Sequence, residues 1–318
     1  MCWKGMLPNV QSKQGIVIML VLIQAAIYGL GNVLMKIAYL GISPMWCAVL
    51  RFGLAFVLFM LFFGRRVIST FKGKRLRTWL PSCLLMAASF LLCGLAVNLT
   101  SATNAGFFMA LPMLFTPVLS LVVLRRAYTL QTVLLQGVVI AGLYLLCCNG
   151  GALSFGPGEF CGLASSACFA ASIVMAEHGL GEVDAIAMSV AQIGVTFVTA
   201  TGAAIVFEVP PVLDAVPLES WVAIAFLAVI GTCVAFFLQN FALSRIPSAT
   251  VSVLLCAEPV FTAAISAVAL GEVLTSVGIV GAALIVACTM AASLEDTQIT
   301  LPHRIVHEHV QRLSSVRR

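Results

Sequence analysis

One carboxylate stands in the middle of a long apolar run. Glu258, in the stretch LLCAEPVF, lies about eleven residues from each end of a predicted span from 247 to 270. At 1.5 Å per residue it lies roughly 17 Å from either end, near the centre of a bilayer. An ionised carboxylate costs about 2.5 kcal/mol or more at that depth, so it must face protein or water. Thr262 and Ser266 extend a polar stripe along its helix face, and Pro259 frees a backbone carbonyl. This group can bind a coupling proton or a substrate cation, or form a structural hydrogen bond between helices.

Arg51 is the second candidate, and it is a cation. It lies seven residues into a predicted span from 44 to 63. A guanidinium at that depth reaches the membrane surface only in part, so it needs partners inside the protein. It can bind a substrate carboxylate, or it can donate to carbonyls that end neighbouring helices.

The cysteine and histidine residues do not form a pattern that is typical of a metal or cofactor site. The eleven cysteines include no CxxC pair and have no partnering histidine cluster. Buried cysteines of this kind usually pack as small apolar side chains. We therefore expect no metal and no cofactor.

The composition indicates that most of this chain lies in a membrane, where polar side chains are costly. Of the 318 residues, 61% are hydrophobic and 9% are charged, whereas soluble domains carry roughly 25% charged residues. The sequence therefore predicts an integral membrane protein with no soluble domain. The net charge of +5 comes from basic residues beside membrane ends, which argues against nucleic acid as a partner.

Ten apolar segments are long enough to cross about 30 Å of hydrocarbon as helices. They are 15–38, 44–63, 79–99, 104–124, 129–148, 159–178, 183–207, 219–241, 247–270 and 275–293.

The distribution of basic residues predicts the orientation. With the N-terminus inside, fifteen of the seventeen Lys and Arg residues fall on inner segments, and the outer loops carry acidic residues instead. Basic residues near span ends are retained on the cytoplasmic side. Both termini are therefore expected in the cytoplasm, with residues 296–318 as a basic cytoplasmic tail.

The two halves of the chain repeat each other. Ser101-Ala102-Thr103 and Pro112 recur 147 residues later as Ser248-Ala249-Thr250 and Pro259. We expect repeats over 1–150 and 155–295, each with five spans. Because five is odd, the second copy enters the membrane from the opposite side, as in many secondary transporters. The predicted fold class is thus an all-α integral membrane protein with ten transmembrane helices in two inverted five-helix repeats.

Three stretches resemble one family: TSATNAGFFMALPMLFTPVL (100–119), SATVSVLLCAEPVFTAAISAVALGE (248–272) and LRFGLAF (50–56). They are similar to ten-span EamA-type members of the drug/metabolite transporter superfamily. One departure is Arg126, where that pattern usually carries an acidic residue. The resemblance implies a bundle around a central cavity lined by spans 1, 3, 4, 6, 8 and 9. It also implies export of amino acids, metabolites or drugs from the bacterial cytoplasm.

The resemblance adds candidates to Glu258 and Arg51. Asn32, Asn104 and Gln239 fall on the expected lining spans, and Tyr28 lies one turn before Asn32. The glycine-containing stretches GLGN (29–32) and GLASSA (162–167) are expected to let helices approach closely.

The predicted function is a secondary active transporter, an exporter of small organic metabolites, in the bacterial cytoplasmic (inner) membrane. Its expected partners are a small-molecule substrate, a coupling proton and the lipid bilayer. No Walker motif indicates direct use of ATP. One alternative is a membrane enzyme that transfers lipid or prenyl groups, yet no span carries the clustered carboxylates that hold Mg²⁺ on a diphosphate. A non-catalytic receptor or channel is the other alternative, which the repeat disfavours. We expect no enzymatic activity.

Overall fold

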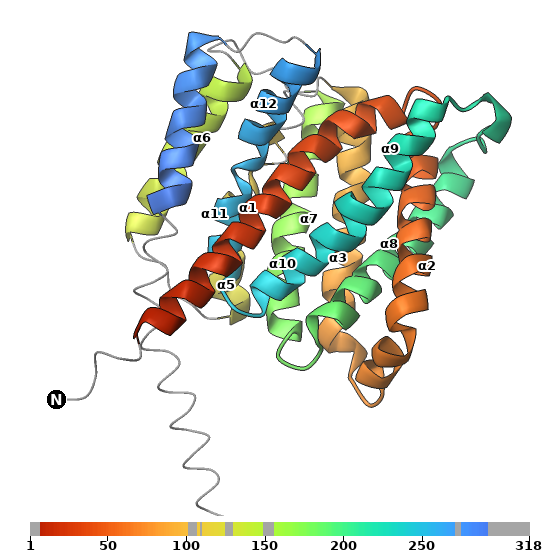
Figure 1. Ribbon diagram of the computed structural model, residues 1–318, viewed down its shortest axis with the longest axis horizontal. Coiled ribbons are helices and arrows are strands. Elements are labelled where there is room, and N and C mark those ends of the chain that lie inside the picture. The colour runs from red at the N-terminus through yellow and green to blue at the C-terminus, as the bar shows by residue number, and fades with distance from the viewer. Residues whose placement is uncertain are drawn as a thin grey trace, which may run out of the picture.

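The computed structural model describes residues 7–100, 107–108, 110–124, 130–148, 156–270 and 275–291, and within these ranges every regular element is a helix (Figure 1). The labelled elements are α1 (Leu7–Ala38), α2 (Pro44–Phe71), α3 (Leu76–Leu99), α5 (Pro112–Leu124), α6 (Leu130–Cys148), α7 (Pro157–Gly179), α8 (Ala185–Phe207), η1 (Leu213–Ala215), α9 (Leu218–Ala228), η2 (Val229–Val234), α10 (Ala235–Leu243), α11 (Ser248–Leu255) and α12 (Glu258–Leu270). One more helix, Ser276–Ala291, follows them.

Seven helical segments of the described chain are long and apolar enough to cross a membrane. They are Gln14–Ala38, Pro44–Phe71, Leu76–Leu99, Pro157–Gly179, Ala185–Phe207, Leu218–Leu243 and Ser248–Ile265. Within the other three predicted spans, the described residues form shorter apolar helices, Pro112–Leu124, Leu134–Leu146 and Ser276–Ala291. Large apolar side chains such as Phe62 and Phe207 are exposed on the outside of the bundle, where lipid tails would cover them. An all-helical membrane protein is thus confirmed for the described residues, and the count of ten spans stays a prediction.

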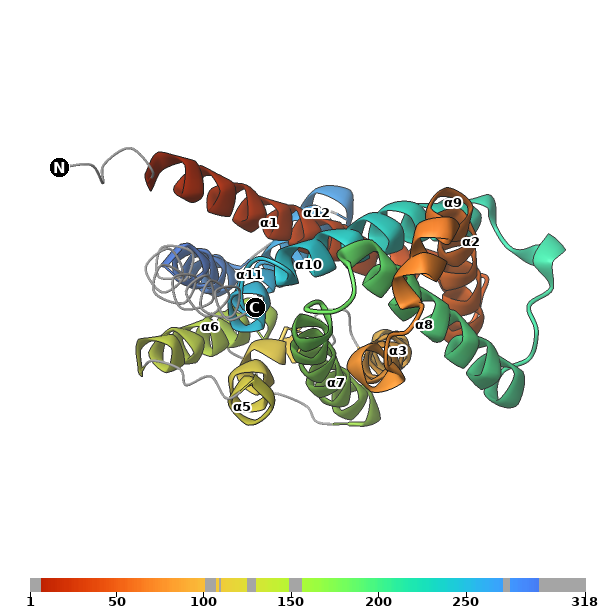
Figure 2. The ribbon, with the colours of Figure 1, turned by 90° about the horizontal axis from the view of Figure 1, so that it is seen from below.

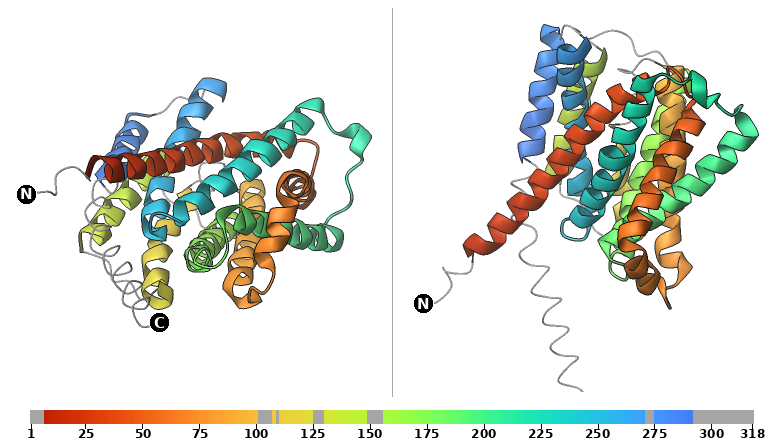
Figure 3. Two further views of the ribbon diagram at one scale, coloured as in Figure 1. Left: turned by 60° about the horizontal axis from the view of Figure 1, so that its bottom comes forward. Right: turned by 45° about the vertical axis from the view of Figure 1, so that its right-hand side comes forward.

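The helices form one elongated bundle. Viewed from below (Figure 2), α5 and α6 lie at one end, α2 and α8 at the other, and α3 and α7 between them. Helices α3 and α7 pack side by side, as do α2 and α8. The long helix α1 crosses the bundle obliquely and contacts α9, α10, α11 and α12 (Figures 1 and 3). This crossing brings the N-terminal helix against elements from the far end of the sequence.

Glycines permit two of the close helix contacts. A Cβ on Gly29 would lie 2.9 Å from the Phe261 Cβ and 3.0 Å from the Glu258 carbonyl oxygen, so α1 and α12 touch at this point. A Cβ on Gly162 of α7 would lie 2.9 Å from the Phe108 Cβ. Both stretches therefore serve close helix packing, which confirms the expectation for GLGN and GLASSA.

A turn interrupts the predicted span 247–270. Helix α11 ends at Leu255, residues 256 and 257 form a turn, and α12 begins at Glu258. Pro259 has no backbone N–H, which removes one hydrogen bond that would continue the helix. In the first half, residues 110 and 111 form a turn and α5 begins at Pro112. Neither interruption is expected from the continuous apolar pattern of these two stretches.

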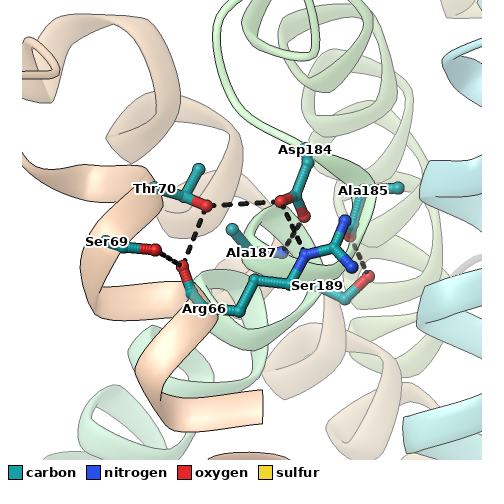
Figure 4. A network of polar contacts seen from close by, with 7 residues as sticks. All are labelled: Arg66, Ser69, Thr70, Asp184, Ala185, Ala187 and Ser189. Atoms are coloured by element: carbon teal, nitrogen blue, oxygen red, sulfur yellow. Dashed lines mark hydrogen bonds and ion pairs between the residues drawn. The ribbon is translucent and has the colours of Figure 1, made fainter.

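Polar contacts join the loops at the two ends of the bundle. At one end, Arg66 of α2 forms an ion pair with Asp184 before α8, with Nε and Oδ2 3.1 Å apart (Figure 4). At the other end, Glu208 after α8 accepts hydrogen bonds from the Ser43 hydroxyl at 2.5 Å and the Met45 amide at 3.1 Å. The basic segment 64–78, which comprises the end of α2, the turn after it and the start of α3, thus lies at the same end as the turn before Asp184, as the predicted topology requires.

Candidate functional site

Four of the six predicted site residues line one cavity of about 70 Å³. Tyr28 and Asn32 come from α1, Arg51 from α2, and Glu258 from the start of α12. The rest of its wall comes from α1, α3, α7 and η2: Ile27, Gly31, Met35, Ser89, Phe90, Cys93, Ser165, Ser166, Phe169 and Gly231. The cavity therefore lies where α1 crosses the bundle, between elements from both halves of the chain.

Glu258 is held from α1. Its Oε1 accepts a hydrogen bond from Asn32 Nδ2 at 2.7 Å, and its backbone carbonyl accepts one from the Thr262 hydroxyl at 3.0 Å. Thr262 Oγ1 also lies 3.5 Å from Asn32 Nδ2. Thr262 is thus part of the predicted polar stripe, whereas the side chain of Ser266 lies outside the described residues. Because Glu258 is the first residue of α12, its carboxylate lies at the positive end of that helix dipole, which favours a negative charge.

Arg51 is buried, with 5% of its surface exposed. Its Nε donates to the Thr232 hydroxyl at 2.7 Å, and its Nη2 donates to the Gly231 carbonyl at 2.9 Å. Nη1 lies 3.9 Å from the Met35 sulfur. The guanidinium carbon is 5.3 Å from the ring centres of both Phe52 and Phe90. The expected contact with a carbonyl of a neighbouring helix is therefore present, and Arg51 faces the cavity as well.

Gln239 lies next to the cavity and is not among the residues that line it. Its Oε1 accepts from Gln24 Nε2 at 2.9 Å and from the Tyr28 hydroxyl at 3.4 Å. We call Gln24, Tyr28 and Gln239 the amide layer. Gln24 and Gln239 are fully buried, and the Gln24 Oε1 and Gln239 Nε2 atoms have no hydrogen-bond partner among the described residues. Asn104, the sixth candidate, lies outside the described residues.

The resemblance placed spans 3 and 6, which are α3 and α7, in the cavity lining, but the sequence singled out none of their cavity residues. Ser89 of α3 and Ser165 of α7 line the cavity and bond to each other, with the Ser165 hydroxyl 2.9 Å from the Ser89 carbonyl. Serines are common between packed membrane helices, so neither residue stood out from the sequence. Among the described residues there is no group of three or more His, Cys, Asp or Glu side chains that could hold a metal ion.

Two other buried amides serve packing. Asn240 Nδ2 donates to Gln192 Oε1 at 2.8 Å, and Gln192 Nε2 donates to the Ser82 hydroxyl at 2.9 Å. These contacts join α3, α8 and α10, and none of the three residues lines the cavity. They are hydrogen bonds that hold helices together.

Comparison with known proteins identifies the family. The model of the EamA-like transporter family matches residues 15–148 and again residues 156–294. An uncharacterized transporter of Archaeoglobus fulgidus is 26% identical over 272 residues, which cover 85% of this chain and 83% of that protein. A crystal structure of another protein superposes with a TM-score of 0.74 at 18% identity, and the match covers 91% of this chain and 99% of that one. The structural match concerns the fold alone. This chain is therefore a membrane-spanning member of the EamA-like transporter family, within the drug/metabolite transporter superfamily.

Proposed function

We propose that this chain is a secondary active transporter that exports small organic metabolites, such as amino acids or drugs, by alternating access. The observation that carries the proposal is the cavity where Tyr28, Asn32 and Arg51 from the first half meet Glu258 from the second. A substrate in this cavity touches both halves, so movement of one half against the other would expose it first to one side and then to the other.

The proposed moving parts are two inverted repeats, 1–150 and 155–295. Support comes from the two separate family matches and from the helix interruptions before Pro112 and Pro259, which occupy equivalent positions in the predicted repeats. Interrupted helices at matching places in two halves are typical of substrate sites in transporters with inverted repeats.

Glu258 is the proposed coupling residue. It binds a proton or a substrate cation, and Asn32 keeps the carboxylate at the cavity wall through its 2.7 Å hydrogen bond. A zwitterionic substrate would place its carboxylate at Arg51 and its ammonium group at Glu258. In this proposal Asn104 completes the lining, and Gln239 acts through its hydrogen bond with the Tyr28 hydroxyl.

The proposed location is the bacterial cytoplasmic membrane, with both termini in the cytoplasm. The excess of Lys and Arg in the predicted inner segments supports this orientation. The contact of Arg66 with Asp184 supports it further. It places the turn between α7 and α8, which has no basic residue of its own, beside the basic segment 64–78.

Counterflow in liposomes tests the proposal. Liposomes that contain only the purified protein are loaded with an unlabelled amino acid or metabolite, and uptake of the same radiolabelled compound is measured without nucleotide. We expect transient accumulation of label for at least one member of the panel, because a carrier exchanges substrate across the membrane. A channel gives only equilibration, and an enzyme that needs a lipid acceptor gives no uptake. Folded protein that gives no counterflow with any compound would contradict the proposal.

A further inference from the structure

Arg51 is a buried cation whose hydrogen-bond partners are all neutral. They are the Thr232 hydroxyl, the Gly231 carbonyl and the Met35 sulfur. The ion pair that joins two described residues is that of Arg66 with Asp184, and Arg51 forms none with a described carboxylate. Removing a charge from water without a counter-charge is expensive. The groups bonded to Arg51 thus supply no negative charge to offset that cost.

The π-helical turn η2 determines how Arg51 is held. Thr232, inside this turn, accepts from Arg51 Nε and donates to the Leu227 carbonyl, five residues earlier, at 2.8 Å. The adjacent Gly231 carbonyl accepts from Nη2. Two edges of the planar guanidinium are thus bonded to η2, which fixes its plane. Turns of this kind occur frequently at functional sites.

The third edge of the guanidinium is held weakly. Nη1 has the Met35 sulfur at 3.9 Å, and a thioether is a weak acceptor. Met35 and Arg51 both line the cavity. An anionic group in the cavity could replace the sulfur at Nη1, form a charge-assisted hydrogen bond and supply the missing countercharge. Glu258 lines the same cavity, but its carboxylate is bonded to Asn32.

We propose that Thr232 is a positioning residue that orients Arg51 so that Nη1 forms an anion subsite of the cavity, suited to a substrate carboxylate. This inference rests on the proposed transport function and specifies one chemical feature of the substrate. It requires the Thr232 hydroxyl, because that group alone joins Arg51 Nε to the backbone of α9.

The electrostatic potential of the cavity can be measured without knowing the substrate. Cys93 lines the cavity and serves as a reporter after the other ten cysteines are replaced by Ala or Ser. Purified protein in detergent is reacted with an anionic thiol reagent, 2-sulfonatoethyl methanethiosulfonate. A parallel reaction uses the cationic 2-(trimethylammonio)ethyl methanethiosulfonate. The ratio of the anionic to the cationic rate constant reports the potential near Arg51.

In Arg51→Gln we expect this ratio to fall about tenfold or more, equivalent to about 1.4 kcal/mol. Thr232→Val, which keeps the shape and loses the hydroxyl, should lower the ratio about threefold, because Arg51 is then free to turn away. Thr232→Ala removes the same hydroxyl with less bulk and provides a second variant. Thr232→Ser should restore the ratio of the unmodified protein.

Thr196→Val is the matched control. Thr196 is equally buried, and its hydroxyl donates to the Gln192 carbonyl away from the cavity, so its replacement should leave the ratio unchanged. An unchanged ratio in Arg51→Gln would overturn the anion subsite. If neither reagent reaches the buried Cys93 thiol, the same ratio is measured with Ser165→Cys, since Ser165 also lines the cavity. An unchanged ratio in both Thr232→Val and Thr232→Ala would overturn the positioning role. Labelling in detergent needs no transport, so these outcomes are independent of the counterflow result.

Discussion

Two side chains of opposite charge line the cavity without forming an ion pair with each other. Arg51 is bonded to η2, and Glu258 is bonded to Asn32 of α1. A direct ion pair would neutralise both groups and leave little for a ligand to bind. Separate anchoring keeps both charges available, which suits a substrate or a coupling ion that must bind and leave in each cycle.

Replacing Glu258 by Gln tests the carboxylate itself. A glutamine retains the size of the side chain and still accepts the hydrogen bond from Asn32, so the protein should insert and fold. We expect net flux to fall about tenfold or more, which corresponds to a coupling free energy of about 1.4 kcal/mol or greater. If Glu258 carries a proton, the residual exchange should also lose its dependence on pH. If Glu258 binds a substrate cation, affinity should weaken at every pH.

Glu182→Gln is the control for this experiment, because it makes the same change at an exposed residue in the turn between α7 and α8. It should transport normally. A well-folded Glu258→Gln protein with unaltered flux and an unaltered pH profile would leave Glu258 with only the structural role of bonding Asn32.

At the scale of the elements, the contact between α1 and α12 brings Asn32 to Glu258. Gly29→Ala adds a Cβ that would lie 2.9 Å from the Phe261 Cβ and from the Thr262 backbone nitrogen. The helices must separate to admit it. Overpacking of this kind costs about 1 to 3 kcal/mol, so we expect a lower unfolding temperature and reduced flux.

Gly202→Ala provides the comparison, since nothing lies within 4 Å of a Cβ built on Gly202, in the last third of α8. Alanine is the better helix former by about 1 kcal/mol, so this variant should be at least as stable as the parent. Equal unfolding temperatures for the two variants would contradict a tight contact between α1 and α12.

The start of α8 should make stability depend on pH. Partial burial acts to raise the pKa of Asp184. The hydrogen bond from the Ala187 amide, at 2.9 Å, and the Arg66 guanidinium outweigh this effect and lower the pKa below its usual value. Because folding lowers this pKa, the stabilisation is complete above the pKa of the unfolded chain and is lost as the pH falls through the folded-state pKa.

Unfolding temperatures measured from neutral to acidic pH check this. Asp184→Ala removes the helix cap and should cost about 1 kcal/mol at neutral pH. Asp184→Asn keeps a capping side chain without the titrating group, so it should remain more stable than the alanine variant and show a shallower dependence on pH. Parallel curves for the parent and Asp184→Asn would exclude Asp184 as a source of acid sensitivity.

At the scale of the whole molecule, the proposed orientation can be checked from both ends of the bundle. Lys74 lies in the turn between α2 and α3, and Asp214 lies in η1 between α8 and α9. Both are exposed. On a cysteine-free background, an impermeant thiol reagent added to intact cells should label Asp214→Cys. It should label Lys74→Cys only after the cells are permeabilised. The reverse pattern would invert the topology.

The extent to which the sequence predicts the site varies with the physical origin of each feature. Glu258 and Arg51 stand out because a charge inside an apolar span needs a partner. Asn32 follows from the resemblance, which places its span in the cavity lining, and Tyr28 follows from its position one turn before Asn32 on the same helix face. By contrast, nothing in the sequence VIGTCV indicates a π-helical turn or its contact with Arg51, which comes from a distant part of the chain. The break before Glu258 had a usable signal, the equivalent prolines at 112 and 259, but proline alone does not distinguish a kink from a turn.

The amide layer makes the contact between α1 and α10 a polar one inside an apolar bundle. Gln239 Oε1 accepts from Gln24 Nε2 at 2.9 Å and from the Tyr28 hydroxyl at 3.4 Å. A hydrogen bond of this kind contributes about 0.5 to 1.5 kcal/mol net, and a difference of a few kcal/mol keeps a minor state populated at about 0.1 to 10%. A transport cycle that separates α1 from α10 would therefore break these two bonds at a cost within the reach of thermal motion.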